Sequence, residues 1–236
     1  MDYRNNTNVG NATIVVTGMG TGGYTGTVTS TFRIVKAPNP LSPKGKTVKT
    51  SYSKLKSKSQ VIKRASAINL GKVEGKVAYA KLWGDGLISV DKKTGNLTLA
   101  KGLKPYIYEV GVLISAAGNG NYNPTKDYVT VTVKVGKGTN PMTAKGKTAT
   151  VSAAKVKKKS QVIAASKAFS VTRAQGKVTY KKVSGNKMIT VASSGRITVK
   201  KGLGKGAYKI KVKVTARGNA NWKAKAQTAT ATVKVK

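Results

Sequence analysis

The sequence predicts an all-β protein built from tandem sandwich modules of roughly one hundred residues each. The first observation is a long internal duplication: Lys44–Thr47 returns as Lys145–Thr148, and Lys101–Leu103 returns as Lys201–Leu203. The second is repeated alternation of apolar and polar residues. The third is a regular spacing of glycine-rich turns between the alternating stretches. A tandem period of this length is typical of domains that each fold around a core of their own.

The alternating stretches predict the strands. Val129–Val135 places Val at every second position, and Ile210–Thr215 and Thr228–Val235 do the same with Ile, Val and Ala. When apolar residues recur at every second position, one set of side chains points inward and the other points toward water, as in half-buried antiparallel strands. No stretch has a comparable helical period. Residues 54–65 and 155–167 come nearest, and their Ser, Gln and Lys content favours a loop with a short strand or turn.

Turn residues separate these strands and set the architecture. Lys92–Asn96 and Ser193–Arg196 are typical of hairpin turns, where Gly supplies a positive φ. Gly118–Asn121 and Gly218–Asn221 hold matching places before the last strand of each module. About seven short strands per module predict an immunoglobulin-like β-sandwich.

The beginning of the chain predicts a hairpin from a third, partial module. Ala12–Thr17 and Thr27–Val35 alternate as two partner strands around a glycine-rich turn. We expect three domains, at residues 1–38, 39–138 and 139–236, with Asn39-Pro40 and Asn140-Pro141 at the borders. A lone hairpin is marginally stable. It therefore docks on the next domain, pairs with another copy, or is the remnant of a divided domain.

Charge and missing residue types exclude several kinds of chemistry. The chain has 45 Lys and Arg against 6 Asp and Glu, and it contains no His and no Cys. This removes the usual general base, thiol nucleophiles and thiolate metal sites. Glu74 and Asp85 flank one predicted strand and could approach each other, but the second module has no acid at either place, and no Asp-x-Asp spacing occurs. The carboxylates are Asp2, Glu74, Asp85, Asp91, Glu109 and Asp127. We expect no enzyme, no metal site and no cofactor. One open alternative is a Lys–Asn cross-link through a buried acid of residues 39–138.

The lysines are the candidate binding residues. A net charge of +39 attracts polyanions, including teichoic-acid-like polymers, DNA, sulfated glycans and anionic lipid, without reading their sequence. The candidates lie in runs or alternate along one strand: Lys155, Lys157, Lys158, Lys159, Lys181, Lys182, Lys200, Lys201, Lys209, Lys211 and Lys213. The alternative is that these lysines only keep exposed strands soluble and unpaired.

Two further features bear on partners. Tyr side chains could stack on bases or fill the sandwich cores; they are Tyr79, Tyr106, Tyr108, Tyr180 and Tyr208. No apolar run approaches the ~18 residues of a membrane span. Residues 1–6 lack the apolar stretch of a secretory signal, so we expect any export signal to lie upstream.

Residues 77–102 and 178–202 resemble the bacterial immunoglobulin-like repeats called group 2, which are common in bacterial surface proteins. The resemblance is carried by Ile88–Asp91 with Gly95–Thr98, and by Ile189–Val191 with Gly195–Thr198. It implies an extracellular or cell-wall setting, neighbouring domains of the same kind, and a stalk, adhesion or wall-association role without catalytic residues. We therefore expect a display module that associates with anionic wall polymers. The alternatives are an adhesin module for a host glycan or protein, and a module that binds extracellular DNA.

Overall fold

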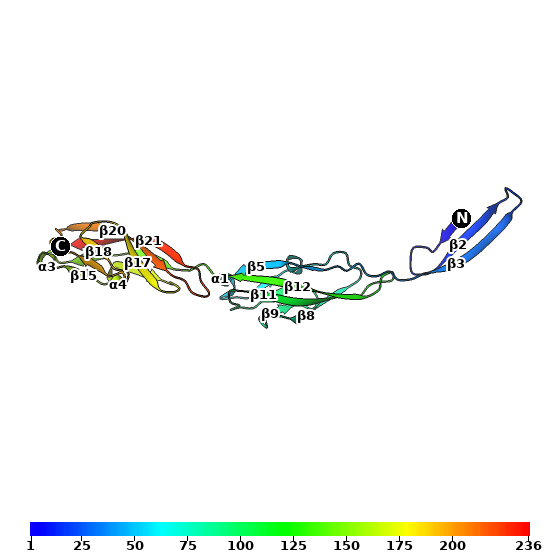
Figure 1. The fold of residues 1–236 in the computed structure, drawn as a ribbon, viewed down its shortest axis with the longest axis horizontal. Helices are drawn as coiled ribbons and strands as arrows, with labels where there is room; N and C mark the ends of the chain where they lie inside the picture. The colour runs from blue at the N-terminus through cyan, green and yellow to red at the C-terminus, as the bar shows by residue number, and fades with distance from the viewer. The chain divides into compact units, whose positions relative to one another are not determined.

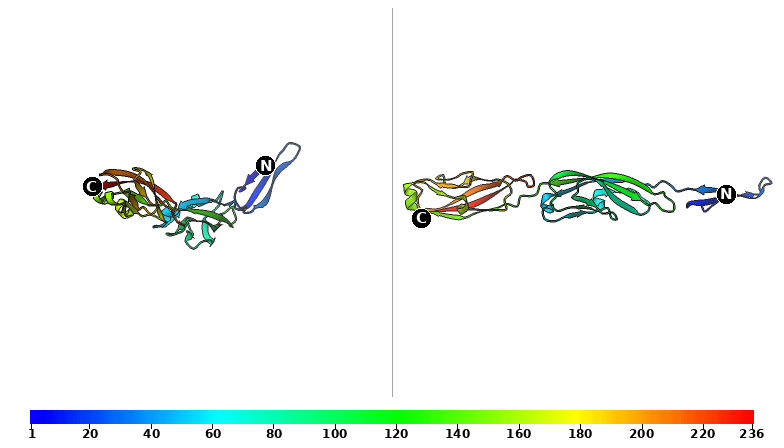
Figure 2. Two further views of the ribbon diagram at one scale, coloured as in Figure 1. Left: turned by 60° about the vertical axis from the view of Figure 1, so that its left-hand side comes forward. Right: turned by 90° about the horizontal axis from the view of Figure 1, so that it is seen from below.

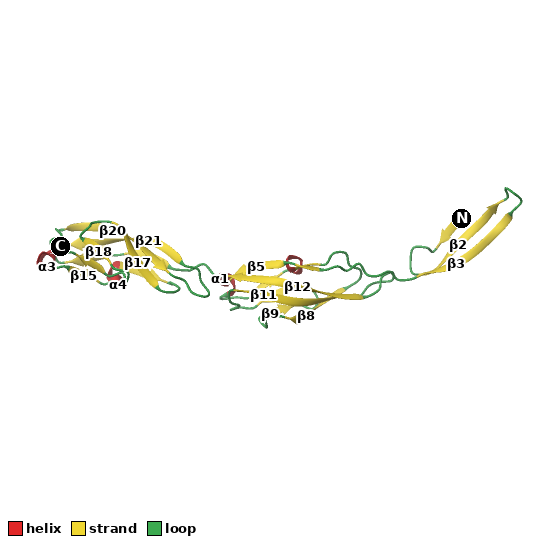
Figure 3. Cartoon of the chain, viewed as in Figure 1, coloured by secondary structure: helices red, strands yellow, loops and turns green.

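The computed structural model describes residues 1–236, and its regular secondary structure consists of strands with four short helices (Figure 3). It divides into two compact units. The first contains Met1–Thr50 and Leu55–Val135, and the second contains Ser51–Lys54 and Gly136–Lys236. The all-β class predicted by the alternation is confirmed.

The chain begins with a three-stranded antiparallel sheet. Its strands are β1 (Asp2–Arg4), β2 (Gly10–Met19) and β3 (Thr25–Ile34), in the order β1-β2-β3. The predicted hairpin is β2 and β3, paired from Gly10 opposite Ile34 to Met19 opposite Thr25. The short strand β1 was not expected, because three residues are too few to show a period.

The sandwich of the first unit has two main layers (Figure 1). One layer is the four-stranded sheet β5-β12-β11-β8, the other is the three-stranded sheet β6-β10-β9, and β4 pairs with β7. In chain order this stretch contains β4 (Lys44–Gly45), β5 (Thr47–Ser51), α1 (Tyr52–Leu55), β6 (Gln60–Ile62), α2 (Arg64–Ala67), β7 (Ile68–Asn69), β8 (Val77–Trp83), β9 (Ile88–Val90), β10 (Leu97–Leu99), β11 (Tyr106–Ala116) and β12 (Thr125–Gly136). Most of α1 groups with the second unit.

The second unit repeats the same layers with β14-β21-β20-β17, β15-β19-β18 and β13-β16. In the larger sheet β14 runs parallel to β21, while its other pairs are antiparallel. The predicted immunoglobulin-like β-sandwich is confirmed. Its elements are β13 (Thr143–Gly146), β14 (Thr148–Val151), α3 (Ala153–Lys158), β15 (Gln161–Ile163), α4 (Ala165–Ala168), β16 (Phe169–Thr172), β17 (Val178–Ser184), β18 (Ile189–Val191), β19 (Ile197–Val199), β20 (Gly206–Ala216) and β21 (Lys225–Val235).

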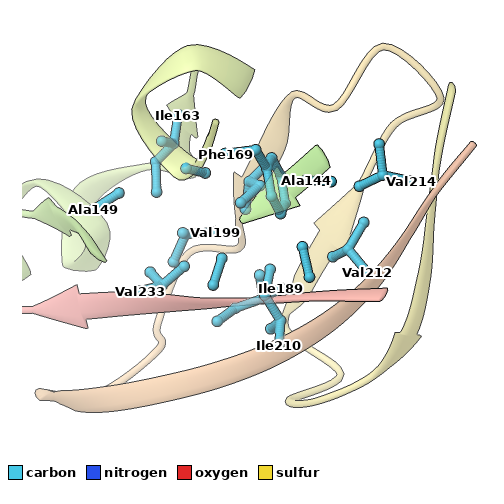
Figure 4. Packing of buried hydrophobic residues seen from close by; sticks show 14 of the residues in the cluster. Ala144, Ala149, Ile163, Phe169, Ile189, Val199, Ile210, Val212, Val214 and Val233 are labelled. Carbon is cyan, nitrogen blue, oxygen red and sulfur yellow. The ribbon is translucent and has the colours of Figure 1, made fainter. Parts of the chain in front are cut away.

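Alternate residues of the long strands fill the core, as their period requires. Ile210 and Val212 of β20 and Val233 of β21 are fully buried. Figure 4 shows them facing side chains such as Val199 and Ile189 of the smaller sheet. The intervening positions of β20 and β21 are therefore left for solvent, and they carry the candidate site.

The helices are a departure from the sequence expectation. Residues 54–65 and 155–167 contain the expected short strands, β6 and β15, but also single helical turns. The longest, α3, has six residues and is capped by Ser152, whose hydroxyl accepts a hydrogen bond from the Lys155 amide. Ala and Lys favour helix locally, yet six residues are too few for an amphipathic period to be visible.

Each border segment is bound to the sandwich that follows it. In the second unit Gly138 forms a parallel bridge with Trp222. The side chain of Asn140 is almost fully buried; its amide group donates to the carbonyls of Gln175 and Lys223. Its carbonyl accepts from the amides of Met142 and Gln175.

The first unit contains the same arrangement at the preceding border. Ala37 forms a parallel bridge with Tyr122, and the side chain of Asn39 donates to the carbonyls of Glu74 and Asn123. These border segments are therefore fixed by specific hydrogen bonds to the following sandwich.

Candidate functional site

The outer face of the larger sheet in the second unit carries a row of lysines. Lys209, Lys211 and Lys213 alternate with the buried residues of β20 and are exposed. Residues two apart on a strand are separated by about 7 Å. Lys181 of β17 lies directly opposite Lys213, so its side chain joins the same row. We call Lys181, Lys209, Lys211 and Lys213 the lysine face; its strands β17, β20 and β21 can be followed in Figure 1.

Threonines and one further lysine border this face on β21. Thr228, Thr230 and Thr232 lie opposite Lys213, Lys211 and Lys209 in the strand register. Lys234 is exposed two residues further along β21 and faces the same side. Sequence reasoning did not select Lys234, although the Thr228–Val235 alternation contains the signal that would have found it.

Six of the remaining predicted lysines, all except Lys182, form a second group at one end of the same unit. Lys155, Lys157 and Lys158 lie in α3, and Lys159 follows it; all four are exposed. The turn that carries Lys200 and Lys201 is bound to this segment. Its hydrogen bonds run from the Lys201 amide to the Ser160 hydroxyl, 3.1 Å, and from the Gly202 amide to the Val156 carbonyl, 3.1 Å. The chain ends beside α3, where the Ala153 amide donates to the Lys236 carbonyl (Figure 2).

Lys182 differs from the other candidates. Its ammonium group donates to the carbonyls of Asn186, at 2.5 Å, and Ile189, at 2.6 Å. Partial burial lowers the pKa of Lys182, because removal from water disfavours the charged form. Lys81 of the first unit makes the equivalent bonds to the carbonyls of Asp85 and Ile88. In both units, therefore, the lysine at this position joins two backbone carbonyls of the turn that follows its strand.

No Asp or Glu side chain compensates the lysine face, since residues 142–236 contain neither. Lys181 and Lys213 are like charges at directly opposed positions, an arrangement that costs stability. The uncompensated ammonium groups produce a positive potential over a flat sheet surface. Such a surface suits a flexible polyanion better than a ligand that needs the two-pronged geometry of Arg.

Three of the carboxylates accept hydrogen bonds within turns and loops of the first unit. Asp91 accepts hydrogen bonds from the Lys93 amide and from the Thr94 amide and hydroxyl. These bonds, led by the Thr94 hydroxyl, lower the pKa of Asp91. Asp85 accepts from the Leu87 amide, and Glu74 accepts from the Asn119 side chain at 2.9 Å. None of the acids is buried, so the premise of a Lys–Asn cross-link through a buried acid is not met.

Two other kinds of functional feature are absent from the structure. No three side chains of the types His, Cys, Asp or Glu gather as a metal-binding group would require. None of the helices has both the length and the apolar character needed to cross a bilayer.

The five candidate tyrosines are divided between core and surface. Tyr79 is buried, and burial raises its pKa, with Arg64 acting in the opposite direction. Tyr180 is partly buried against Phe169, and burial raises its pKa too. The hydroxyls of Tyr108 and Tyr208 donate to the carbonyls of Lys104 and Gly204, while Tyr106 is largely exposed. They do not form a common stacking surface along one strand face.

No family model matches the chain, and no curated protein matches it. Solved structures with a similar arrangement include Drosophila N-cadherin EC1-4, with 17% identity over 89% of this chain and 52% of that one, at a TM-score of 0.40. The titin domains z1z2 in complex with telethonin match with 13% identity over 86% and 98% of the two chains, at 0.35. The chain spans about half the length of the N-cadherin structure and of the human desmocollin-1 ectodomain.

A third neighbour is a SusE-like surface-located polysaccharide-binding protein from the Bacteroides thetaiotaomicron heparin utilisation locus. It has 16% identity over 87% of this chain and 35% of that one, at a TM-score of 0.31.

Proposed function

We propose that the chain is a non-catalytic display module of a bacterial surface protein and associates electrostatically with anionic polymers of the cell wall. The observation that carries the proposal is the lysine face, where four ammonium groups share one exposed sheet surface without any carboxylate in residues 142–236. The group around α3 adds further positive charge in the same unit. The resemblance to bacterial immunoglobulin-like repeats supports the extracellular setting.

The physical basis of this association is the release of counterions from the polymer. A polyanion that lies along the lysine face exchanges condensed cations for ammonium groups, so the logarithm of the binding constant falls linearly with the logarithm of salt concentration. Lys offers point charges without base-reading geometry, and the bordering threonines can donate hydrogen bonds to phosphate oxygens.

The test is binding to immobilised wall teichoic acid between 50 and 500 mM NaCl. The variant replaces Lys209, Lys211 and Lys213 by Ser. A matched control replaces Lys92, Lys93 and Lys101 of the first unit by Ser, which removes the same charge from exposed turns. We expect the slope of log K against log salt to fall by about two to three for the first variant, and by clearly less for the control.

Equal effects of the two variants would show that net charge alone attracts the polymer and would contradict a role for the lysine face. Retention that does not change with salt would contradict the electrostatic mechanism itself. Competition with DNA of equal charge separates the alternative: DNA that displaces teichoic acid completely at a lower charge concentration would favour DNA as the partner.

A further inference from the structure

The same sheet face has a different character in the two units. In the second unit it carries the lysine face. The duplication places Ala80, Glu109, Gly111 and Leu113 of the first unit at the positions of Lys181, Lys209, Lys211 and Lys213. Four positive charges are thus replaced by one acid and three uncharged residues. The strands concerned, β8, β11 and β12, are neighbours in the sheet of the first unit (Figure 1).

A tryptophan lies on this surface. Trp83 of β8 is opposite Gly111 of β11 in the strand register. A Cβ atom built at Gly111 would overlap Nε1 of Trp83 and lie 2.5 Å from Cε2 and 2.6 Å from Cδ1. Contact with three consecutive ring atoms at such similar distances means that the indole lies face-on against the strand. Gly111 is therefore buried on an outer face, while Trp83 as a residue remains 44% exposed.

Further apolar side chains continue the surface. Tyr128 of β12 is opposite Leu113, one row from Gly111, and is 62% exposed. Trp83 on β8 and Tyr128 on β12 flank β11, so their backbones are two strand spacings and one row of about 7 Å apart, and the indole lies over Gly111 between these two strands. Thr130 lies opposite Gly111, and Glu109 is exposed one row beyond it. The result is two flat aromatic side chains with a hydroxyl and a carboxylate at their border.

We propose that this surface, defined by Trp83, Gly111, Leu113 and Tyr128, is a binding site for neutral glycans. The apolar C–H face of a hexose ring packs on an exposed aromatic ring, and its hydroxyls find donors and acceptors in Thr130 and Glu109. Aromatic side chains supply such contact area with a polar handle at low conformational cost.

Charge and size select this occupant. Glu109 and the loss of four lysines make this surface less suited to phosphate or sulfate groups than the same face of the second unit, with Lys126 and Lys134 left on β12. A stable protein interface buries about 800 Å² per partner and involves about 20–30 residues a side. The aromatic surface has four residues and a polar border, which matches one or two sugar rings. This site is independent of the lysine face and of the function proposed for it.

The experiment titrates the complete chain with cellohexaose, mannohexaose, maltohexaose and chitohexaose at 500 mM NaCl, where polyanion binding is suppressed. Calorimetry measures affinity, and the indole N–H signals in a ¹H–¹⁵N spectrum locate the contact. The two indole signals are told apart because the Trp83→Ala variant lacks one. We expect at least one oligosaccharide to bind and to shift the Trp83 signal while the Trp222 signal, from a buried indole, stays in place.

Variants then test the residues. Trp83→Ala and Tyr128→Ala remove exposed side chains and should each weaken binding about tenfold or more. Gly111→Ala forces the indole off the strand and should have the same effect together with a changed Trp83 signal. Tyr106→Ala removes an exposed tyrosine elsewhere on β11 and should leave affinity unchanged. The Lys209, Lys211 and Lys213 variant should also bind sugar normally, which separates this proposal from the electrostatic one.

Three results would overturn the proposal. One is that none of the four oligosaccharides binds. Another is that sugar binds but affinity is unaffected by Trp83→Ala. The third is that single-stranded oligo-dT, and no sugar, binds with an affinity that depends on Trp83, which would assign the surface to base stacking.

Discussion

At the scale of single residues, the turn acids and lysines show how local hydrogen bonds set electrostatics. Asp91 is exposed, yet three hydrogen bonds from Lys93 and Thr94 lower its pKa. A carboxylate whose pKa is lower in the folded state stabilises the fold fully above its unfolded value, near pH 4. That contribution is lost as pH falls through the lower, folded pKa.

We therefore expect Asp91→Asn to lower the unfolding temperature of the first unit by a few degrees at pH 7, because the amide accepts weaker hydrogen bonds. The difference from the parent chain should shrink toward zero as pH falls below about 4. Calorimetric scans from pH 3 to 7 measure it. The second unit, with Ala192 at the matching position, is the internal reference. A difference that stays constant with pH would contradict the assignment to ionised Asp91.

The alternation of residue types along β20 predicted which of its lysines face solvent, but the sequence did not separate the roles of Lys181 and Lys182. The alternation around Lys209, Lys211 and Lys213 places them outward in both sequence and structure. Consecutive residues Lys181 and Lys182 look alike in the sequence, and only the pairing register shows that Lys181 faces Lys213 while Lys182 pairs with buried Val212. The bulge after Lys182 completes the separation. The role of each remaining lysine in binding stays a prediction.

The stacking of Trp83 on Gly111 was beyond sequence reasoning for the same reason. The two residues are far apart in the chain, and a bulge between Gly111 and Val112 sets their register. A lone glycine in a strand is a recognised sign of close approach by another group. Which group approaches depends on strand pairing, and the apolar pattern does not specify that.

At the scale of elements, long strands were predictable and short elements were not. β11, β12, β20 and β21 are each eleven or twelve residues long, so the period of two is clear. Short helices and strands such as α3 and β1 carry no period and depend on caps and tertiary pairing. The duplication in the sequence predicted that the same elements would recur, and they do in both units.

β13 provides an element-scale prediction. A Cβ atom at Gly146 would overlap the carbonyl of Thr230 in β21, closer than any real side chain comes to a backbone atom. We expect Gly146→Ala to reduce the free energy of unfolding of the second unit by about 3 kcal/mol, because β13 must move away from the sheet. Chemical denaturation measures the change. Gly204→Ala, where the nearest atom is 4.0 Å away, should change it little. Equal stability of the two variants would contradict the close packing of β13.

At the scale of the whole molecule, repulsion among the lysines opposes folding. The net charge is +39, and residues 142–236 contain no acid at all. Salt screens repulsion between exposed charges over about 10 Å at 0.1 M. We expect the unfolding temperature to rise by several degrees between 20 and 500 mM NaCl, and to rise more for the second unit than for the first. Differential scanning calorimetry resolves the two.

The control is the same measurement in choline chloride at equal ionic strength. Screening depends on ionic strength and not on the identity of the cation, so the unfolding temperature should rise equally in both salts. An unfolding temperature that falls with salt in both solutions would mean that attractive ion pairs outweigh repulsion, contrary to the charge distribution described above.

The hydrogen-bonded border segments have a consequence for how such a molecule changes length over evolutionary time. The side chains of Asn39 and Asn140 bind their segments to the sandwich that comes next in the chain. A stretch of coding sequence that runs from one such asparagine to the following one therefore encodes both the asparagine and the backbone carbonyls to which its side chain donates. Unequal recombination can insert or delete whole copies that keep these asparagine bonds, and each added copy is free to acquire its own surface chemistry.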